Sequence, residues 1–196
     1  MHPIILASAS PRRQELLQRA GFAFTVQPAD VDETVPATFT PDETVRFLSA
    51  KKARHIAPNA PVNHLIIGAD TVVALDDAIL GKPADHAEAF TMLRRLQGRW
   101  HTVYTGVTVL APENVSGREE YTFVETARVC MRPLTDAEIE AYIATGEPFD
   151  KAGSYGIQEK GALLIERVEG DYFTVVGLPL CRLGMVLSRF DNILFS

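Results

Sequence analysis

The chain has 196 residues, with 25 acidic and 19 basic side chains and a formal net charge of −6. Hydrophobic residues make up 46% and charged residues 22%, values that are typical of a globular protein and argue against disorder. The mild acidity argues against a dedicated nucleic-acid-binding protein, and the apolar run over 65–75 is shorter than the ~20 residues that span a bilayer. We therefore expect a soluble, cytoplasmic protein that forms a single domain over residues 1–196.

Signals for helices and strands alternate along the first half of the chain. Ser10 followed by Pro11 is typical of a helix start, with serine at the N-cap and proline at the first helical position. Thr40 and Glu43 form a capping box, which predicts a second helix start. In chain order we expect a strand over 4–7, a helix from 11 to about 20, a strand over 22–27, a helix from 41 to about 56 and a strand over 65–73.

The second half begins with a helix and then becomes richer in strands. Asp85 and Thr135 are the expected N-caps of two helices. We expect, in order, a helix over 86–98, β segments over 101–110 and 121–131, a helix over 136–144, a hairpin of 161–168 with 172–176 and a helix over 179–190. This alternation, with adjacent strands late in the chain, predicts an α/β fold with a mixed sheet.

The segment from Ser8 to Arg13 places two hydroxyl groups and two arginines at a predicted helix start. A helix N-terminus carries partial positive charge and unpaired N–H groups, so arginines in the first turn are mildly unfavourable there. A bound anion would remove that cost, because helix N-termini and guanidinium groups both bind phosphate oxygens. Ser8, Arg12 and Arg13 are therefore candidate phosphate-binding residues, although two solvated arginines on a capped helix would give the same pattern.

Asp70 interrupts one of the most apolar stretches of the chain. Because an unpaired buried carboxylate is costly, Asp70 is either satisfied by its neighbours or acts as a metal ligand or a base. Helical periodicity places Lys52 within the apolar stripe of its predicted helix, which contains Val45, Leu48 and Ile56. The lysine ammonium group could extend past the core to water, or it could reach into a functional site.

Two later segments carry polar groups that could contact a substrate. Lys82 lies between a glycine and a proline, and the proline restricts Lys82 to an extended backbone. The glycine-containing segment 150–158 predicts a loop that ends at Gln158, whose amide can recognise the edge of a base. A surface turn and a tight structural loop explain these two patterns equally well.

Together these cations and carboxylates suit phosphate chemistry, and Asp32 and Glu33 add an acidic pair in a loop that is by default solvated. The cations can hold phosphate oxygens, while the carboxylates can hold a divalent ion and activate water. Magnesium prefers oxygen ligands, and Cys130, Cys181 and the five histidines show no spacing typical of zinc ligands. The sequence contains no Walker glycine loop and no protein-kinase signature, which disfavours a kinase.

Seven blocks of the sequence, taken in order, resemble the Maf family of nucleoside triphosphate pyrophosphatases. Any one block alone would be weak support, but the ordered set is specific and extends over nearly the whole chain. The blocks are ILASASPRR at 5–13, VDE at 31–33, KKA at 51–53, GADTVV at 68–73, GKP at 81–83, DKAGSYGIQ at 150–158 and VGLP at 176–179.

This resemblance implies a fold like that of inosine triphosphate pyrophosphatases, a mixed sheet in two lobes around a central cleft. It also implies hydrolysis of a nucleoside triphosphate to the monophosphate and pyrophosphate with a divalent cation, Mg²⁺ or Mn²⁺. In this reading Asp70 is the catalytic proton acceptor, and Asp70 and Glu33 hold the metal. A homodimer is possible, and no nucleic-acid or membrane partner is expected.

The resemblance further assigns roles to the cationic and polar residues. Residues that match phosphate-handling positions are Ser8, Arg12, Arg13, Lys52 and Lys82, and we count Lys52 and Lys82 as catalytic with Asp70 and Glu33. Arg12, Thr71 and Gln158 resemble the subgroup that acts on dTTP and UTP and differ from the subgroup that acts on 7-methyl-GTP. Thr71 and Gln158 are therefore expected to recognise a pyrimidine base.

Two other functions compete with this interpretation. A nucleotidyltransferase also begins with a strand, Leu-Ala and a basic helix start, but it needs glycines where this chain has Ser8 and Ser10. A regulatory protein could bind triphosphates without cleaving them. A DNA-binding regulator is the least favoured alternative, because the chain is acidic and contains no recognisable helix-turn-helix.

Overall fold

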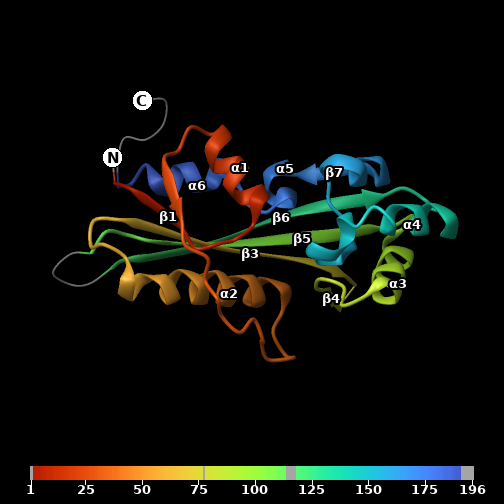
Figure 1. The fold of residues 1–196 in the computed structure, drawn as a ribbon, viewed down its shortest axis with the longest axis horizontal. Helices are drawn as coiled ribbons and strands as arrows, with labels where there is room; N and C mark the ends of the chain where they lie inside the picture. The colour runs from red at the N-terminus through yellow and green to blue at the C-terminus, as the bar shows by residue number, and fades with distance from the viewer. Residues whose placement is uncertain (1, 77, 114–117, 191–196) are drawn as a thin grey trace. The chain divides into compact units, whose positions relative to one another are not determined.

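The structure is a computed structural model that describes residues 2–76, 78–113 and 118–190. Its strands are β1 (Ile4–Leu6), β2 (Phe24–Val26), β3 (Leu65–Leu75), β4 (Ala78–Leu80), β5 (Trp100–Leu110), β6 (Glu120–Met131) and β7 (Ile165–Gly170). They form one sheet in the order β2-β1-β3-β5-β6-β7, with β4 paired to β3 (Figure 1). β1 pairs in parallel with β2 and β3, whereas the β3–β4 and β6–β7 pairs are antiparallel. The predicted α/β fold with a mixed sheet is confirmed.

The helices begin close to the residues that the capping patterns predict. They are α1 (Pro11–Arg19), α2 (Pro41–Ile56), α3 (His86–Leu96), α4 (Asp136–Ile143), α5 (Tyr172–Val176) and α6 (Leu180–Leu187). Short 3₁₀ segments are η1 (Ala57–Asn59), η2 (Glu147–Asp150), η3 (Ala152–Ser154) and η4 (Glu159–Leu164). Both predicted capping boxes, at Thr40 and Thr135, are formed. Ser10 precedes α1 as expected, but its side chain makes no capping hydrogen bond. Among the described residues, no helix is long and apolar enough to cross a membrane.

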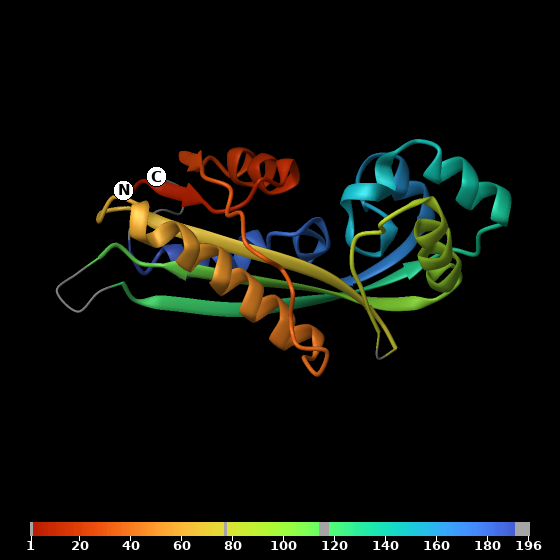
Figure 2. The ribbon, with the colours of Figure 1, turned by 60° about the horizontal axis from the view of Figure 1, so that its bottom comes forward.

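Contacts divide the chain into two compact units, and β3, β5 and β6 each contribute residues to both. The first unit comprises residues 1–70, 105–125 and 177–196, and the second comprises 71–104 and 126–176. In the first unit, α2 lies along one face of the sheet, and α1 and α6 lie on the other (Figures 1 and 2). We describe each unit separately.

In the first unit, two glycines allow helix α2 to lie directly against the sheet. A Cβ atom on Gly68 would lie 2.2 Å from the carbonyl oxygen of Ser49, and one on Gly106 would lie 2.4 Å from that of Val45. Real Cβ atoms do not approach backbone atoms so closely, so both positions require glycine unless the helix moves away. The close packing brings the α2 residue Lys52 next to the strand that carries Asp70.

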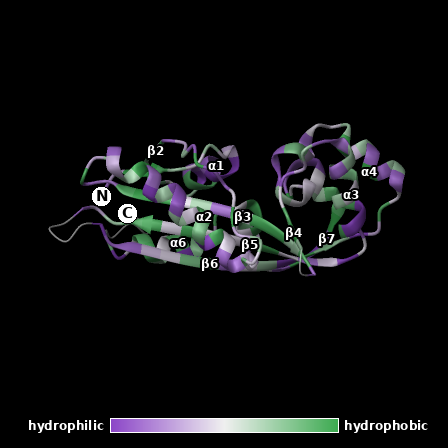
Figure 3. Cartoon of the chain, turned by 90° about the horizontal axis from the view of Figure 1, so that it is seen from below, coloured by the Kyte–Doolittle hydropathy of each residue, from purple (hydrophilic) through white to green (hydrophobic). Residues whose placement is uncertain are grey.

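The core of the second unit lies between its strands and helices α3 and α4. Hydrophobic residues follow the strands, while the outward faces of α3 and α4 carry hydrophilic residues (Figure 3). Leu93 and Leu96 of α3 and Ile139 of α4 are fully buried in this core. The buried His101 side chain also lies within the second unit, where its Nε2 is 2.6 Å from the Tyr155 hydroxyl.

The predicted hairpin of 161–168 with 172–176 is wrong. Strand β7 pairs with β6 instead, and the second half of the predicted hairpin forms helix α5. The helix starts here because Asp171 caps it: its carboxylate accepts hydrogen bonds from the backbone N–H groups of Phe173 and Thr174. The 3₁₀ segment η4 (Glu159–Leu164) takes the place of the first four residues of the predicted hairpin, 161–164.

Candidate active site

At the centre of the candidate site, one buried ammonium group lies between two carboxylates. Nζ of Lys52 is 2.6 Å from Oδ1 of Asp70 and 2.7 Å from Oε1 of Glu33. Lys52 comes from α2, Asp70 from β3, and Glu33 from the loop before α2. Lys52 and Asp70 are each only 7% exposed, whereas the Glu33 side chain is half exposed. The sequence-predicted residues Lys52, Glu33 and Asp70 therefore meet in the first unit.

Burial and nearby charge act on Asp70 in opposite directions. Burial raises the pKa of the Asp70 carboxyl above its ordinary value, and the negative charge of Glu33 adds to this. The positive charges of Lys52 and Arg13 lower the pKa but do not cancel the effect of burial. A carboxylate whose pKa is raised in this way is better suited to accept a proton during a reaction.

Arg13 is fixed in place by two hydrogen bonds near the start of α1. Its Nε donates to the Gly177 carbonyl oxygen at 2.8 Å, and its Nη1 donates to the Ser8 hydroxyl oxygen at 3.0 Å. The Ser8 hydroxyl also accepts a hydrogen bond from the Ser10 N–H. Burial lowers the pKa of the Arg13 guanidinium, while the charge of Asp70 opposes this shift. The first turn of α1 contains Arg12 and Arg13 and no acidic residue.

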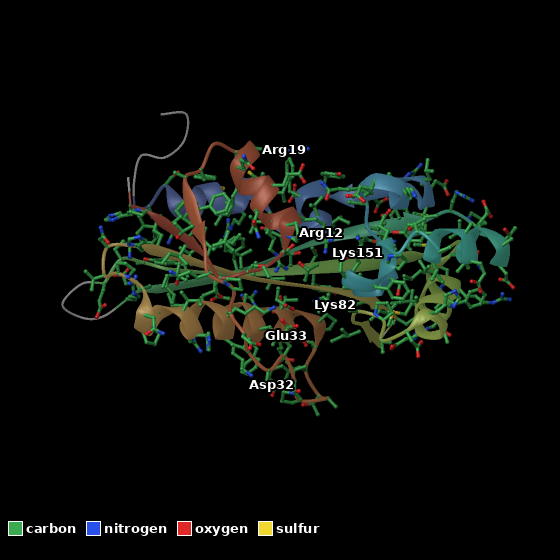
Figure 4. The ribbon with its side chains drawn as sticks, in the orientation of Figure 1. Arg12, Arg19, Asp32, Glu33, Lys82 and Lys151 are labelled. Atoms are coloured by element: carbon green, nitrogen blue, oxygen red, sulfur yellow. The ribbon has the colours of Figure 1, made fainter. Side chains whose placement is uncertain are left out.

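The loop before α2 is attached to the helix by a second lysine. Lys51 Nζ donates a hydrogen bond to the backbone carbonyl of Asp32, and the Asp32 carboxylate accepts one from the Thr34 N–H. These bonds hold the segment that carries Glu33. Figure 4 shows Asp32 and Glu33 on this loop and Arg12 at the start of α1. The loop contact thus fixes the backbone next to the Glu33–Lys52 ion pair.

Three of the predicted site residues belong to the second unit. Thr71 is its first residue and is half-buried, and Gln158 is also half-buried. Lys82 is exposed, on the segment between β4 and α3 (Figure 4). The Gly153 N–H donates to the Gly81 carbonyl at 3.0 Å, which ties the segment that carries Lys82 to the loop before Gln158.

The donor set of the first unit indicates what kind of cation would fit. Asp70 and Glu33 both bring a carboxylate oxygen to the Lys52 ammonium group, so two negative groups converge on one point. Within the described ranges, no group of three or more His, Cys, Asp or Glu side chains is arranged to hold a metal. Mg²⁺ is commonly bound by one or two carboxylates together with waters and substrate phosphates. Asp70 and Glu33 therefore fit a cation that is shared with a phosphate.

The sequence matches the family described as "Maf-like protein" over residues 3–190. The chain belongs to this family. A dTTP/UTP pyrophosphatase of Bacillus mycoides is 46% identical to this Maf-like chain over 192 residues, which cover 98% of the chain and 97% of the relative. A dTTP/UTP pyrophosphatase of Bacillus cereus is 47% identical over 191 residues, with 97% of each protein covered.

Among solved structures, the Maf-like chain is similar to a nucleoside-triphosphatase, dITP/XTP pyrophosphatase, from Mycobacterium abscessus. That match has a TM-score of 0.39 and 16% identity, and covers 66% of this chain and 72% of the other. A HAM1 protein from Coxiella burnetii matches with a TM-score of 0.42 and 20% identity over 66% of this chain and 73% of the other.

The structure also assigns contacts that the sequence analysis did not. The Gly177 carbonyl accepts a hydrogen bond from Arg13, and Tyr142 and Glu147 form hydrogen bonds with the loop that carries Gln158. Gly177 lies within the family block at 176–179, so this block could have marked it as a residue of the site. Tyr142 and Glu147 lie outside all seven blocks, and no local pattern marks them.

Proposed function

We propose that this Maf-like chain hydrolyses nucleoside triphosphates, with dTTP and UTP as substrates, to the monophosphate and pyrophosphate. The observation that carries the proposal is the contact of the buried Lys52 ammonium group with the carboxylates of buried Asp70 and half-exposed Glu33, near Arg13. Burying the Lys52–Asp70 ion pair is costly in stability, and opposed carboxylates and cations are what phosphate hydrolysis requires. The printed names of the relatives, dTTP/UTP pyrophosphatase, support the choice of substrate.

In the proposed mechanism, Asp70 accepts the proton of a water molecule whose oxygen attacks the α-phosphorus. A new P–O bond forms there, the bond to the bridging oxygen breaks, and pyrophosphate leaves with that oxygen. Ser8, Arg12, Arg13, Lys52 and Lys82 hold phosphate oxygens and offset the charge that develops on the leaving group. A Mg²⁺ or Mn²⁺ ion held by Asp70 and Glu33 would polarise the phosphate when bound.

For the second unit, we propose that Thr71 and Gln158 recognise the pyrimidine base. Gln158 carries both donors and an acceptor, as recognition of a base edge requires. We also propose that residues 1–196 act as one functional domain in the cytoplasm, with a nucleotide as the partner.

The test is a panel of nucleoside triphosphates incubated with the purified chain and Mg²⁺ or Mn²⁺, with pyrophosphate detection and chromatography of the products. We expect dTTP and UTP to yield the monophosphate and pyrophosphate without any acceptor molecule, which a nucleotidyltransferase would need. Recovery of unchanged UTP together with measurable UTP binding would contradict hydrolysis and favour the regulatory nucleotide-binding alternative.

A further inference from the structure

The segment 156–161, which carries Gln158, is held at its start by the side chain of Tyr142. The Gly156 N–H donates a hydrogen bond to the Tyr142 hydroxyl oxygen at 3.2 Å. The same hydroxyl donates its proton to Oε1 of Glu147 at 2.9 Å. Tyr142 is only 5% exposed, and this burial raises the pKa of its hydroxyl, which therefore keeps the proton that it donates.

The end of the same segment is held by the Glu147 carboxylate. The Gly161 N–H donates to its Oε1 at 3.1 Å, and the Lys160 N–H donates to its Oε2 at 3.3 Å. Hydrogen bonds to a carboxylate are stronger than bonds between neutral groups. Because Tyr142 and Glu147 are bonded to each other, they connect the two ends of the segment. We call these two residues the brace.

The backbone of the braced segment is tightly constrained. A Cβ atom on Gly161 would lie 1.9 Å from the Gly156 carbonyl oxygen and 2.8 Å from the Tyr142 hydroxyl, so the two ends of the segment touch. Glu159, directly after Gln158, has a φ of 55°, in the left-handed region that residues other than glycine rarely adopt. Such a conformation persists only where the surrounding contacts impose it.

The brace is itself fixed by its neighbours. Tyr142 lies on α4, and Glu147 begins η2. Lys151 Nζ donates to the Glu147 carbonyl oxygen at 2.7 Å and to the carboxylate of Asp150 at 2.7 Å. Lys151 also packs its side chain against Gly156, where a Cβ atom would lie 2.6 Å from the lysine Cε. Lys151 therefore contacts both the brace and the start of the braced segment.

The side chain of Gln158 is not held by the hydrogen bonds that fix the backbone of its segment. It occupies the N-cap position of η4 and is half-buried, but its side chain makes no capping hydrogen bond. The segment thus has a fixed backbone and an amide that does not cap its own helix, an arrangement that suits recognition of a ligand.

We propose that Tyr142 and Glu147 are positioning residues that hold the Gln158 amide in place for the pyrimidine base of the substrate. The inference rests on the proposed function, because the role of Gln158 belongs to it. The brace touches no substrate in this account. Its contribution is to reduce the conformational freedom that Gln158 would otherwise lose on binding.

The experiment combines the variants Tyr142→Phe and Glu147→Gln with two substrates. We expect each variant to raise KM for UTP about tenfold, the order of effect that loss of one hydrogen bond produces, with kcat within about twofold of wild type. Ribose 5-triphosphate has no base, so its KM should not change. Tyr172→Phe and Glu169→Gln are the matched controls, because both side chains are exposed in the same unit, and they should behave as wild type.

A double-mutant cycle then separates positioning from general destabilisation. Once Gln158→Ala has removed the amide, Tyr142→Phe should add no further increase in KM for UTP, because positioning residues act through the group that they position. Additive effects, or an equal loss with ribose 5-triphosphate, would overturn the brace while leaving the hydrolase intact. A wild-type chain that cleaves no triphosphate would overturn the proposed function and this inference with it.

Discussion

The two units of the chain can be compared through one buried polar pair in each. The first unit buries charge, in the ion pair of Lys52 with Asp70, whereas the second buries a neutral pair, His101 with Tyr155. The neutral pair is joined by a hydrogen bond, although His101 Nδ1 is buried without a hydrogen-bond partner in the described part of the chain. A buried ion pair is often no more stable than the hydrophobic residues that could replace it. The comparison teaches that the charged pair carries the larger cost, because it removes two full charges from water.

The largest expected effect is on the charged cluster. Asp70→Asn should lower kcat about a thousandfold, because it removes the proton acceptor and a negative charge together. The fold should persist, because asparagine has the same shape as aspartate and is neutral. Its burial therefore does not carry the cost of removing a carboxylate charge from water. Steady-state kinetics and circular dichroism measure both outcomes.

The matched control for Asp70→Asn is Asp76→Asn. Asp76 is exposed, pairs with Arg99 on the surface, and has a φ of 55°, which asparagine tolerates. The control should retain wild-type turnover. Near-normal turnover of Asp70→Asn would refute the role given to Asp70.

Removing the Lys52 cation should show how much it costs to bury the Asp70 carboxylate without its partner. Lys52→Met leaves the Asp70 carboxylate buried without its nearest positive charge, which should destabilise the fold by about 4 kcal/mol at neutral pH. Without Lys52, the pKa of Asp70 should rise further above its ordinary value, because a positive charge that lowers it is gone. The loss of stability in Lys52→Met should therefore become smaller as the pH falls and the Asp70 carboxyl takes up a proton. Urea unfolding at several pH values measures this.

Lys51→Met is the comparison for Lys52→Met. Its ammonium group donates to the Asp32 backbone carbonyl near the surface and lies 5.7 Å from the centre of the Phe47 ring, so stability should change little. Equal destabilisation by the two changes would contradict the difference between a buried and an exposed lysine.

The neutral pair of the second unit should make stability depend on pH. Burial lowers the pKa of His101 from 6.5 to about 4, so the folded state binds a proton less readily than the unfolded state. The contribution of neutral His101 to the free energy of unfolding is complete above pH 6.5. As the pH falls towards 4 this contribution is lost, and the free energy of unfolding decreases by about 3 kcal/mol in total. Unfolding free energies across this range, compared with those of His101→Gln, which cannot titrate, test the prediction: identical slopes would contradict it.

The smallest effect concerns the approach of α2 to the sheet, which brings the charges together. Gly68→Ala places a Cβ atom 2.2 Å from the Ser49 carbonyl oxygen, so α2 must shift, at a cost of about 2 kcal/mol. The shift should also lower kcat, because Lys52 moves relative to Asp70. Gly81→Ala meets nothing within 4 Å and serves as the stability control in thermal unfolding.

Much of the candidate site could be predicted from the sequence, for identifiable reasons. Asp70 stands out because it breaks an apolar strand, and Lys52 because it falls within the apolar stripe of a helix. Glu33 has no such local signal and was assigned through the family resemblance alone. In the structure, Glu33 forms an ion pair with Lys52. The brace was not predicted, because Tyr142 and Glu147 look like ordinary residues of a helix and a turn until the loop folds onto them.

The sequence by itself determined where most helices and strands begin and which family the chain belongs to. Capping boxes, prolines and hydrophobic periodicity act within one or two turns, so they can be read without knowing the fold. Only the tertiary structure decided that β7 pairs with β6 and not with residues 172–176, and that Arg13 bonds to Gly177, 164 positions away. Such contacts join segments that only the packed sheet brings together, so no local pattern specifies them.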